Sequence, residues 1–256
     1  MSFKSETSAM QQSGWWETGK IILQALVLAM FVRVFFYQPF NIPSGSMKGT
    51  LLVGDYLFVS KLSYGYSRYS FPWGLIPFKG RFFASEPKRG DVAVFKLPRD
   101  NSTDYIKRVI GLPGDTVQMR GGVLFINGKE VPKRRIEDFI GVSESGLRRR
   151  VPQYEETLPN GVKYRVLDEE RGSPMDDTDV FKVPPRHFFM MGDNRDNSTD
   201  SRAQWNVGFV PRDNMVGRAD IIFFSAETEE GGSFSSIRPW TWPGGIRWSR
   251  FFRIVR

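Results

Sequence analysis

The segment DYIKRVIGLPGD, residues 104–115, decides the fold class of this chain. Its first half alternates, so that one face of a β-strand carries Tyr105, Lys107 and Val109. The opposite face of that strand carries Ile106, Arg108 and Ile110. Its second half, residues 112–115, holds a Pro-Gly pair that is typical of a tight turn. A strand that ends in such a turn predicts an antiparallel β-structure.

Further short β-type runs lie on both sides of this strand. They are bounded by turn-forming residues and comprise Tyr56–Ser60, Asp91–Lys96, Val123–Ile126 and Ile221–Phe224. The pair Asn127-Gly128 predicts a hairpin within Val123–Val131. No long amphipathic helix pattern occurs after the apolar run that ends at Tyr37. The sequence therefore predicts a mainly β protein in which the polar stretch 131–183 is a loop-rich insertion or second subdomain.

An apolar run near the N-terminus predicts a membrane-spanning helix. Residues Ile21–Tyr37 are interrupted only by Gln24 and Arg33, and as a helix they span about 25 Å, slightly less than a bilayer core. Two alternatives stay open. The run could be a buried helix of a soluble domain, or it could be the apolar region of a secretory signal that is cleaved near the small residues Ser44-Gly45-Ser46. We favour an uncleaved anchor because Arg33 and Pro39 interrupt the pattern of a cleaved signal.

The composition narrows the possible chemistry. The 256 residues carry a formal net charge of +8 and include 22 Phe, 8 Tyr and 7 Trp, an aromatic content that suits contact with lipid or apolar peptide. The lack of cysteine excludes thiol catalysis, disulfides and thiolate metal sites. The single histidine, His187, excludes His-cluster metal sites and is the one candidate for a Ser–His–Asp triad. Dispersed arginines without a zinc-finger or RNP-type motif argue against nucleic-acid binding.

A first segment with catalytic potential is IPSGSMKGTLL, residues 42–52, which directly follows the predicted anchor. Gly45 lets the backbone bend beside Ser46, so that this serine can present its Oγ and its own N–H to one carbonyl group. Alone, a Ser-Gly-Ser triplet is weak evidence, since most such triplets belong to ordinary loops. Its place after the anchor predicts that any chemistry of Ser46 occurs at a membrane surface.

Lys107 has two interpretations. It is either a lysine at the sheet edge whose ammonium group reaches solvent, or a desolvated lysine on an apolar face. Burial disfavours the charged form of a lysine and lowers its pKa, which produces a usable general base. The strand alone leaves both interpretations open.

A third segment, MGDNRDNSTDSR at residues 191–202, is dense in hydrogen-bonding groups. A calcium loop is one interpretation, since Asp193, Asp196 and Asp200 offer oxygen ligands. Their spacing does not fit an EF-hand, and Arg195 and Arg202 oppose cation binding. The segment is better explained by Asp–Arg ion pairs and Ser/Asn hydrogen bonds that stiffen a site.

In this order, behind an anchor, the three segments resemble those of type I bacterial signal peptidases, from about residue 38 to residue 224. The resemblance implies that Ser46 is the nucleophile, that Lys107 is the general base and that Ser44 joins the Ser46 N–H in the oxyanion hole. It implies that Ser198 orients the lysine, with supporting roles for Arg108, Asp200 and Arg202. It also implies shallow pockets for small side chains, lined by Phe40, Ile42, Pro43, Met47, Leu51, Val94, Tyr105 and Ile106.

The same resemblance implies an architecture. The expected fold is a signal-peptidase-like (LexA-like) antiparallel β catalytic core with a β-rich insertion, preceded by one transmembrane helix. Residues 1–18 would be a cytoplasmic N-terminus and 19–38 the anchor. The catalytic core would comprise 39–130 and 184–256, with 131–183 as the inserted subdomain. The family chemistry requires no metal or cofactor.

The implied activity is endoproteolytic removal of signal peptides from exported preproteins, at Ala-x-Ala sites and through a Ser–Lys dyad. The implied location is the bacterial plasma membrane, which the chain crosses once, with the catalytic part on the outer, periplasmic side. Besides the preprotein, the expected partner is membrane lipid, and not nucleic acid. The chain departs from the family at Gly49, where proline is usual, which predicts a looser turn after Ser46.

Three rival functions remain at this point. A self-cleaving Ser–Lys repressor would need a DNA-binding module where the apolar run stands. A specialised maturation peptidase of the same broad type differs only in its substrates. A membrane-tethered β-rich binding protein would lack peptide cleavage altogether.

Overall fold

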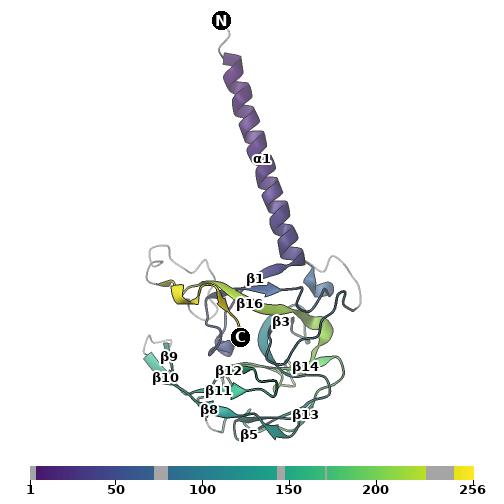
Figure 1. Cartoon of the computed structure of the whole chain (residues 1–256), viewed down its shortest axis with the longest axis vertical. Helices are drawn as coiled ribbons and strands as arrows, with labels where there is room; N and C mark the ends of the chain where they lie inside the picture. The colour runs from purple at the N-terminus through teal and green to yellow at the C-terminus, as the bar shows by residue number, and fades with distance from the viewer. Residues whose placement is uncertain (1–3, 72–79, 143–147, 171, 229–244) are drawn as a thin grey trace.

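The computed structural model describes residues 4–71, 80–142, 148–170, 172–228 and 245–256. One long helix, α1 (Lys4–Phe35), leads into a body built from strands and short 3-10 turns, η1 (Gly45–Met47), η2 (Arg68–Ser70), η4 (Arg212–Asn214) and η7 (Trp248–Arg250). Figure 1 shows α1 projecting from one side of this body. The mainly β fold and the single apolar N-terminal helix were both predicted from the sequence, and both are confirmed.

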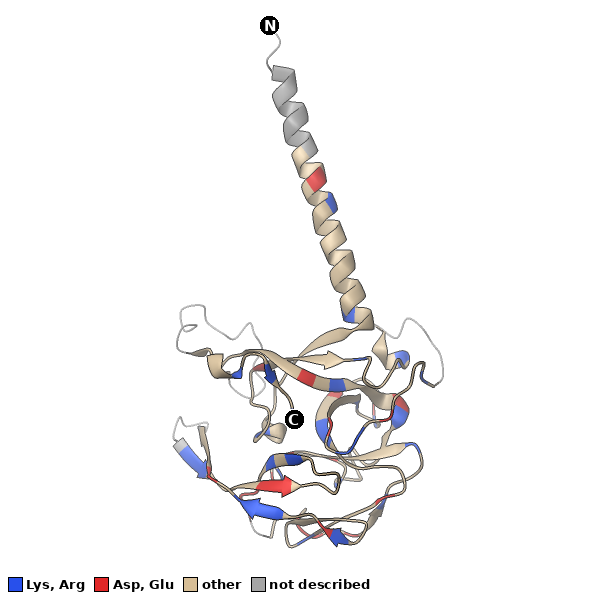
Figure 2. Cartoon of the chain, viewed as in Figure 1, with Lys and Arg blue, Asp and Glu red and all other residues tan. Residues whose placement is uncertain are grey.

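Helix α1 differs in its limits from the expected anchor at 19–38. It begins at Lys4, and it ends at Phe35 because the chain enters a strand at Tyr37. Pro39 disfavours a helical conformation for the residue before it, which explains the early end. The stretch Gly14–Phe35 is long and apolar enough to cross a membrane. Figure 2 shows how few charged residues its described part carries.

The main sheet contains eight antiparallel strands. Its order is β1-β2-β16-β3-β4-β14-β15, with β17 also paired to β16. Their bounds are β1 Tyr37–Asn41, β2 Asp55–Ser60, β3 Val92–Lys96, β4 Asp104–Gly111, β14 His187–Met191, β15 Val210–Pro211, β16 Met215–Ser225 and β17 Arg253–Ile254. Strand β1 forms an edge of the sheet, which is where a proline such as Pro39 is tolerated.

Both faces of the main sheet are buried. Along β3, Val94 packs into one hydrophobic cluster with Leu57 and Ile222, whereas its neighbour Phe95 packs into another with Val109 on the opposite face. This explains why β3 is apolar at four successive positions instead of alternating. The arrangement fixes β4, which carries Lys107, between two packed layers.

A second group of strands lies on the side of the main sheet away from α1 (Figure 1). One sheet contains β5 Thr116–Arg120, β6 Val123–Ile126, β7 Lys129–Glu130 and β13 Phe181–Lys182, in the order β13-β5-β6-β7. A second contains β8 Lys133–Arg135, β11 Gln153–Thr157 and β12 Lys163–Leu167, and a third pairs β9 Phe139–Val142 with β10 Arg148–Val151.

This group includes more of the chain than the predicted insertion. The hairpin expected at Asn127-Gly128 joins β6 to β7, but these strands pair with β5 and β13 and not with the main sheet. Val117, Leu124 and Val166 share one hydrophobic cluster with Phe189 of β14. The hydrophobic cluster is therefore continuous across the boundary expected at residue 130, which stays a prediction.

Candidate active site

Ser46 lies in the 3-10 turn η1, between strands β1 and β2 of the main sheet. The turn is closed by hydrogen bonds from the Lys48 N–H to the Gly45 carbonyl (3.0 Å) and from the Leu51 N–H to the Met47 carbonyl (2.9 Å). Ser46 is buried, with 8% of its surface exposed. A tight, buried turn holds a serine hydroxyl in one place, as a nucleophile requires.

Lys107 reaches Ser46 from strand β4. Its Nζ lies 2.6 Å from Ser46 Oγ and also donates to the Ile106 carbonyl at 3.1 Å. The side chain is buried, with 4% of its surface exposed, and its Nζ lies 5.3 Å from the centre of the Tyr105 ring. Of the two interpretations left open by the sequence, the buried lysine is the one that the structure contains.

The environment of Lys107 makes its neutral form more accessible than that of a free lysine. Burial lowers the pKa of Lys107 to about 8, and the charges of Asp200 and Asp193 oppose this effect without cancelling it. Each of these carboxylates is paired with an arginine, which limits its attraction for the lysine. The site therefore holds a lysine that can give up its proton near neutral pH.

The supporting ion pair expected between Asp200 and Arg202 is present. The Arg202 Nε and Nη2 atoms each lie 2.9 Å from an oxygen of Asp200, and both side chains are almost fully buried. Asp200 also accepts the Gly192 N–H at 3.0 Å, and Arg202 donates to the Arg195 carbonyl at 2.7 Å. The pair thus closes the loop of residues 192–202 on itself.

Arg108 forms a second buried ion pair in the site. Its Nε and Nη2 donate to the two oxygens of Asp193 at 2.9 and 2.7 Å. Thr50 donates its hydroxyl to the same carboxylate at 2.6 Å. The family resemblance implied a supporting role for Arg108 but did not identify Asp193 as its partner. The signal available in the sequence was the position of Arg108 on the strand face opposite Lys107.

Asn194 is a site residue that the sequence analysis missed. Its backbone N–H donates to the Ser46 carbonyl at 3.1 Å, and its Nδ2 donates to the Gly45 carbonyl at 3.2 Å. These two bonds attach the segment of residues 191–202 directly to the turn that holds the serine. In the sequence, Asn194 stands out only as a polar residue between Asp193 and Arg195. That position does not indicate that it binds the turn around Ser46.

Ser44 lies beside Ser46, whereas Ser198 makes no hydrogen bond to Lys107. Ser44 Oγ lies 3.5 Å from Ser46 Oγ, at the limit of hydrogen-bond distance and beside the proposed nucleophile. Ser198 is buried, yet within the described part of the chain its Oγ makes no hydrogen bond and lies against Gly192. The expected hydrogen bond between Ser198 and Lys107 is therefore not formed in this structure, where the Ile106 carbonyl occupies that role.

The expected pocket residues divide into two groups. Ile42, Met47, Leu51 and Val94 have at most 2% of their surface exposed and form part of the core beneath the site. The structure places these four side chains in the core and not at the surface of the site, because they belong to one buried hydrophobic cluster with Leu57 and Val59. Surface remains accessible on Phe40, Pro43, Tyr105 and Ile106.

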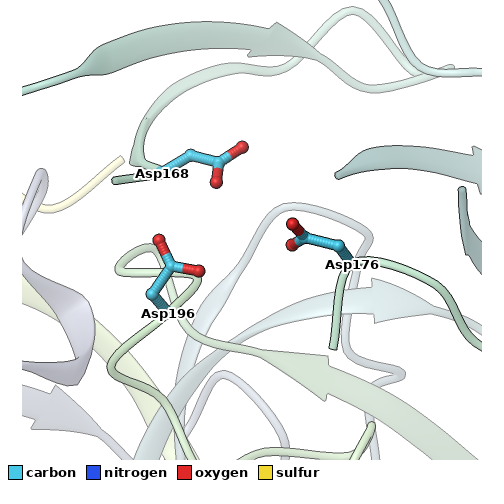
Figure 3. A group of neighbouring side chains, drawn as sticks. All are labelled: Asp168, Asp176 and Asp196. Carbon is cyan, nitrogen blue, oxygen red and sulfur yellow. The ribbon is translucent and has the colours of Figure 1, made fainter. Parts of the chain in front are cut away.

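A separate group of carboxylates lies outside the Ser–Lys pair. Figure 3 shows Asp168, Asp176 and Asp196 facing one another, with ligand-type oxygens within 4.8 Å. Lys133 forms an ion pair with Asp168, and burial, followed by the charge of Asp168, raises the pKa of Asp176. The calcium interpretation of the third segment joined Asp193, Asp196 and Asp200, but the first and last of these bind arginines instead.

The chain is similar to known signal peptidases along most of its length. The family model described as "Signal peptidase, peptidase S26" matches residues 15–224, so the chain is a serine peptidase. A signal peptidase I of Rickettsia akari is 40% identical over 98% of this chain and 95% of its own length. That of Rickettsia typhi is 42% identical over 89% of each chain. The chain belongs to the signal peptidase family and is of type I.

A crystal structure of a signal peptidase I from Enterococcus faecalis is 28% identical, covers 52% of this chain and 97% of its own, and superposes with a TM-score of 0.31. The family and the N-terminal apolar helix together are consistent with a membrane-anchored bacterial protein that acts on preproteins with signal peptides.

Proposed function

We propose that this chain cleaves signal peptides with a Ser46–Lys107 dyad. The observation that carries the proposal is the 2.6 Å separation of Lys107 Nζ and Ser46 Oγ in a buried setting. A general base must lie within hydrogen-bond reach of the proton that it removes, and its pKa must lie near the working pH. Lys107 meets both conditions, because burial lowers its pKa to about 8.

In the proposed reaction, neutral Lys107 accepts the hydroxyl proton while Ser46 Oγ attacks the scissile carbonyl carbon. The resulting oxyanion accepts hydrogen bonds from the Ser46 N–H and the Ser44 hydroxyl, and loss of one such donor typically costs about 3–4 kcal/mol. Protonated Lys107 then donates its proton to the leaving amine as the C–N bond breaks. Water hydrolyses the acyl-enzyme, with Lys107 again acting as the base and the proton finally returning to Ser46.

The proposed substrate has small residues before the cleaved bond, of the Ala-x-Ala type. Ile42, Met47, Leu51 and Val94 are packed too tightly to open a deep pocket beneath the dyad. The exposed parts of Phe40, Tyr105 and Ile106 can therefore offer only shallow apolar depressions. A large side chain would clash there, whereas a methyl group would fit.

The proposed topology places the catalytic body on the outer face of the plasma membrane, with α1 as the anchor in the lipid. Close to α1, aromatic rings form a series across the three neighbouring strands β1, β2 and β16. The ring centres of Tyr37 and Phe58 are 6.2 Å apart, and those of Phe58 and Phe223 are 4.3 Å apart. Such rings suit the interfacial region of a bilayer. We propose the same interfacial role for Trp240 and Trp242 of the C-terminal segment, which lie outside the described residues.

The orientation is tested by adding protease to spheroplasts. We expect the catalytic body to be degraded while the membrane stays intact. Its survival until the membrane is permeabilised would place it on the cytoplasmic side and contradict the proposal.

The dyad is tested by cleavage of a preprotein with an Ala-x-Ala site. We expect Ser46→Ala and Lys107→Met each to lower turnover by at least about a thousandfold while circular dichroism stays unchanged. Lys96→Met is the matched control, because this lysine lies on the neighbouring strand β3 and pairs with Asp104 at 2.9 Å. Full activity of folded Ser46→Ala would exclude the dyad.

Two alternatives are separated by further assays. A specialised maturation peptidase would cleave one precursor and reject a panel of unrelated exported preproteins. A histidine-based triad would require His187, whose Nδ1 lies 2.8 Å from the Pro185 carbonyl at the start of β14. We expect His187→Ala to retain most of its activity, and a thousandfold loss with the fold preserved would favour the triad.

A further inference from the structure

The insertion is joined to the active-site turn by backbone hydrogen bonds. Leu167, the last residue of β12, donates its N–H to the Asp193 carbonyl at 2.8 Å and accepts the Arg195 N–H at 2.9 Å. Asn194, which lies between these two partners, donates to the Ser46 and Gly45 carbonyls. One residue thus separates the insertion from the turn that carries the nucleophile.

A buried ion pair reinforces this junction. Glu156 of β11 accepts two hydrogen bonds from Arg195, at 2.9 and 2.5 Å, and both side chains are at most 1% exposed. Tyr164, opposite Glu156 on the neighbouring strand β12, donates its hydroxyl to Glu156 and accepts one from Arg195 at 3.1 Å. The guanidinium of Arg195 is therefore held by the insertion, whereas its backbone belongs to the active-site loop.

The same network includes Arg108 of strand β4. The Arg108 guanidinium lies 4.3 Å from the centre of the Tyr164 ring while it pairs with Asp193. Arg195 also donates through Nε to the Gly192 carbonyl at 3.3 Å. Loss of the Glu156 charge would leave the Arg195 cation buried without its counter-ion, which is energetically costly. We expect a shift of the loop residues 192–195 to reduce this cost. Such a shift moves the donors of Asn194 relative to Ser46.

We infer that Glu156 is a positioning residue for peptide cleavage and that strands β11 and β12 of the insertion hold Ser46 in register with Lys107 through Arg195 and Asn194. This inference rests on the proposed Ser46–Lys107 dyad. It assigns the insertion a role in turnover and not in substrate binding, since the path ends on the backbone carbonyls of Gly45 and Ser46.

The test is Glu156→Gln in the full chain, purified in detergent and assayed with an Ala-x-Ala preprotein. A displacement of the reacting atoms by a fraction of an ångström to one ångström predicts that kcat falls about tenfold to a hundredfold, with KM nearly unchanged. The matched control is Glu155→Gln, because Glu155 is the adjacent residue on β11 and forms an exposed pair with Arg134 at 3.2 Å. We expect this control to keep the kcat of the parent.

A double-mutant cycle distinguishes positioning from general stability. If Glu156 acts through Asn194, the kcat of the double variant Glu156→Gln, Asn194→Ala should be close to that of the poorer single variant. Effects that multiply would overturn the inference. So would a parent-like kcat for Glu156→Gln below its melting temperature, because this outcome indicates a purely structural residue.

Two further variants keep the test decisive. If Glu156→Gln does not fold, the neutral pair Glu156→Gln, Arg195→Gln removes the unpaired buried charge, and it should fold with a reduced kcat. A parent-like kcat for this folded pair would overturn the inference. Ser46→Ala distinguishes failure of the dyad from failure of the role of Glu156. An active Ser46→Ala would exclude the dyad itself, whereas an inactive Ser46→Ala beside a fully active Glu156→Gln would exclude only the positioning role of Glu156.

Discussion

The Nζ of Lys107 lies 2.6 Å from Ser46 Oγ, whereas Asp200, a nearby carboxylate, is paired with Arg202. Desolvation is therefore the largest influence on the pKa of Lys107, which falls to about 8. With that pKa about a tenth of the lysine is neutral at pH 7, compared with less than about one part in a thousand for a free lysine. A dyad without histidine becomes possible because the surrounding core excludes water from one amine.

The pH dependence of turnover should follow this titration. Since the base is the neutral amine, kcat/KM should rise with pH and level off above about 8, the lowered pKa of Lys107. Lys107→Arg should be as inactive as Lys107→Met, because a guanidinium does not lose its proton in this range. The measurement is preprotein cleavage between pH 6 and pH 10. An active arginine variant would show that Lys107 supplies only charge.

Replacement of Lys107 should stabilise the fold, and this gain in stability should shrink as the pH rises. The folded-state pKa of about 8 lies below the ordinary value of 10.5, so folding disfavours the proton on this lysine. The cost is full below pH 8 and disappears as the pH rises to 10.5. The free energy of unfolding of Lys107→Met at pH 7 should therefore exceed that of the parent by up to about 3 kcal/mol, which denaturant titration measures. This gain should shrink towards pH 10. An equal gain at both pH values would contradict the depressed pKa.

Local patterns were sufficient to predict much of the fold. The alternation around Lys107 identified β4 and its two faces, and Asn127-Gly128 identified the β6–β7 hairpin. The limits of the insertion were not predictable in this way. Val117 and Leu124 look like any half-buried strand residues, and only the structure shows that they share a hydrophobic cluster with Val166.

The candidate site shows the same division. Ser46 and Lys107 were found because the segments around them resemble a known family, and the structure brings the two side chains together. Asp193 and Glu156 were not assigned partners, since ion pairs between residues distant in sequence leave no local pattern. The partners are Arg108, which is 85 residues from Asp193 in the sequence, and Arg195, which is 39 residues from Glu156.

Gly192 should not tolerate a side chain. A Cβ at this position would lie 2.1 Å from Ser198 Oγ and 2.6 Å from the Ser46 carbonyl oxygen. Gly192→Ala must therefore displace the nucleophile turn, and we expect turnover to fall by about a hundredfold or more. Gly141→Ala is the matched control, because the added Cβ meets only the Phe139 ring at 3.4 Å. Comparable kcat values for the two variants would contradict this account of the turn.

Gly49 explains why this chain departs from the proline usual in its family. The φ angle of Gly49 is +111°, whereas a proline ring fixes φ near −65°, so the structure excludes proline at this position without a change of the turn. The expectation of a looser turn is thus replaced by a turn of different geometry. It leads into Thr50, whose hydroxyl binds Asp193 at 2.6 Å.

We expect Gly49→Pro to lower both Tm and kcat, because the chain must leave the geometry that brings Thr50 to Asp193. Gly49→Ala should be milder, since a left-handed conformation costs an ordinary residue roughly 1–2 kcal/mol, although its Cβ would also approach the Arg165 carbonyl at 3.0 Å. The measurements are thermal unfolding and preprotein cleavage for the parent and both variants. The expected order of Tm is parent, then alanine, then proline. A proline variant with the Tm and kcat of the parent would show that the positive φ angle is not required for the active-site turn.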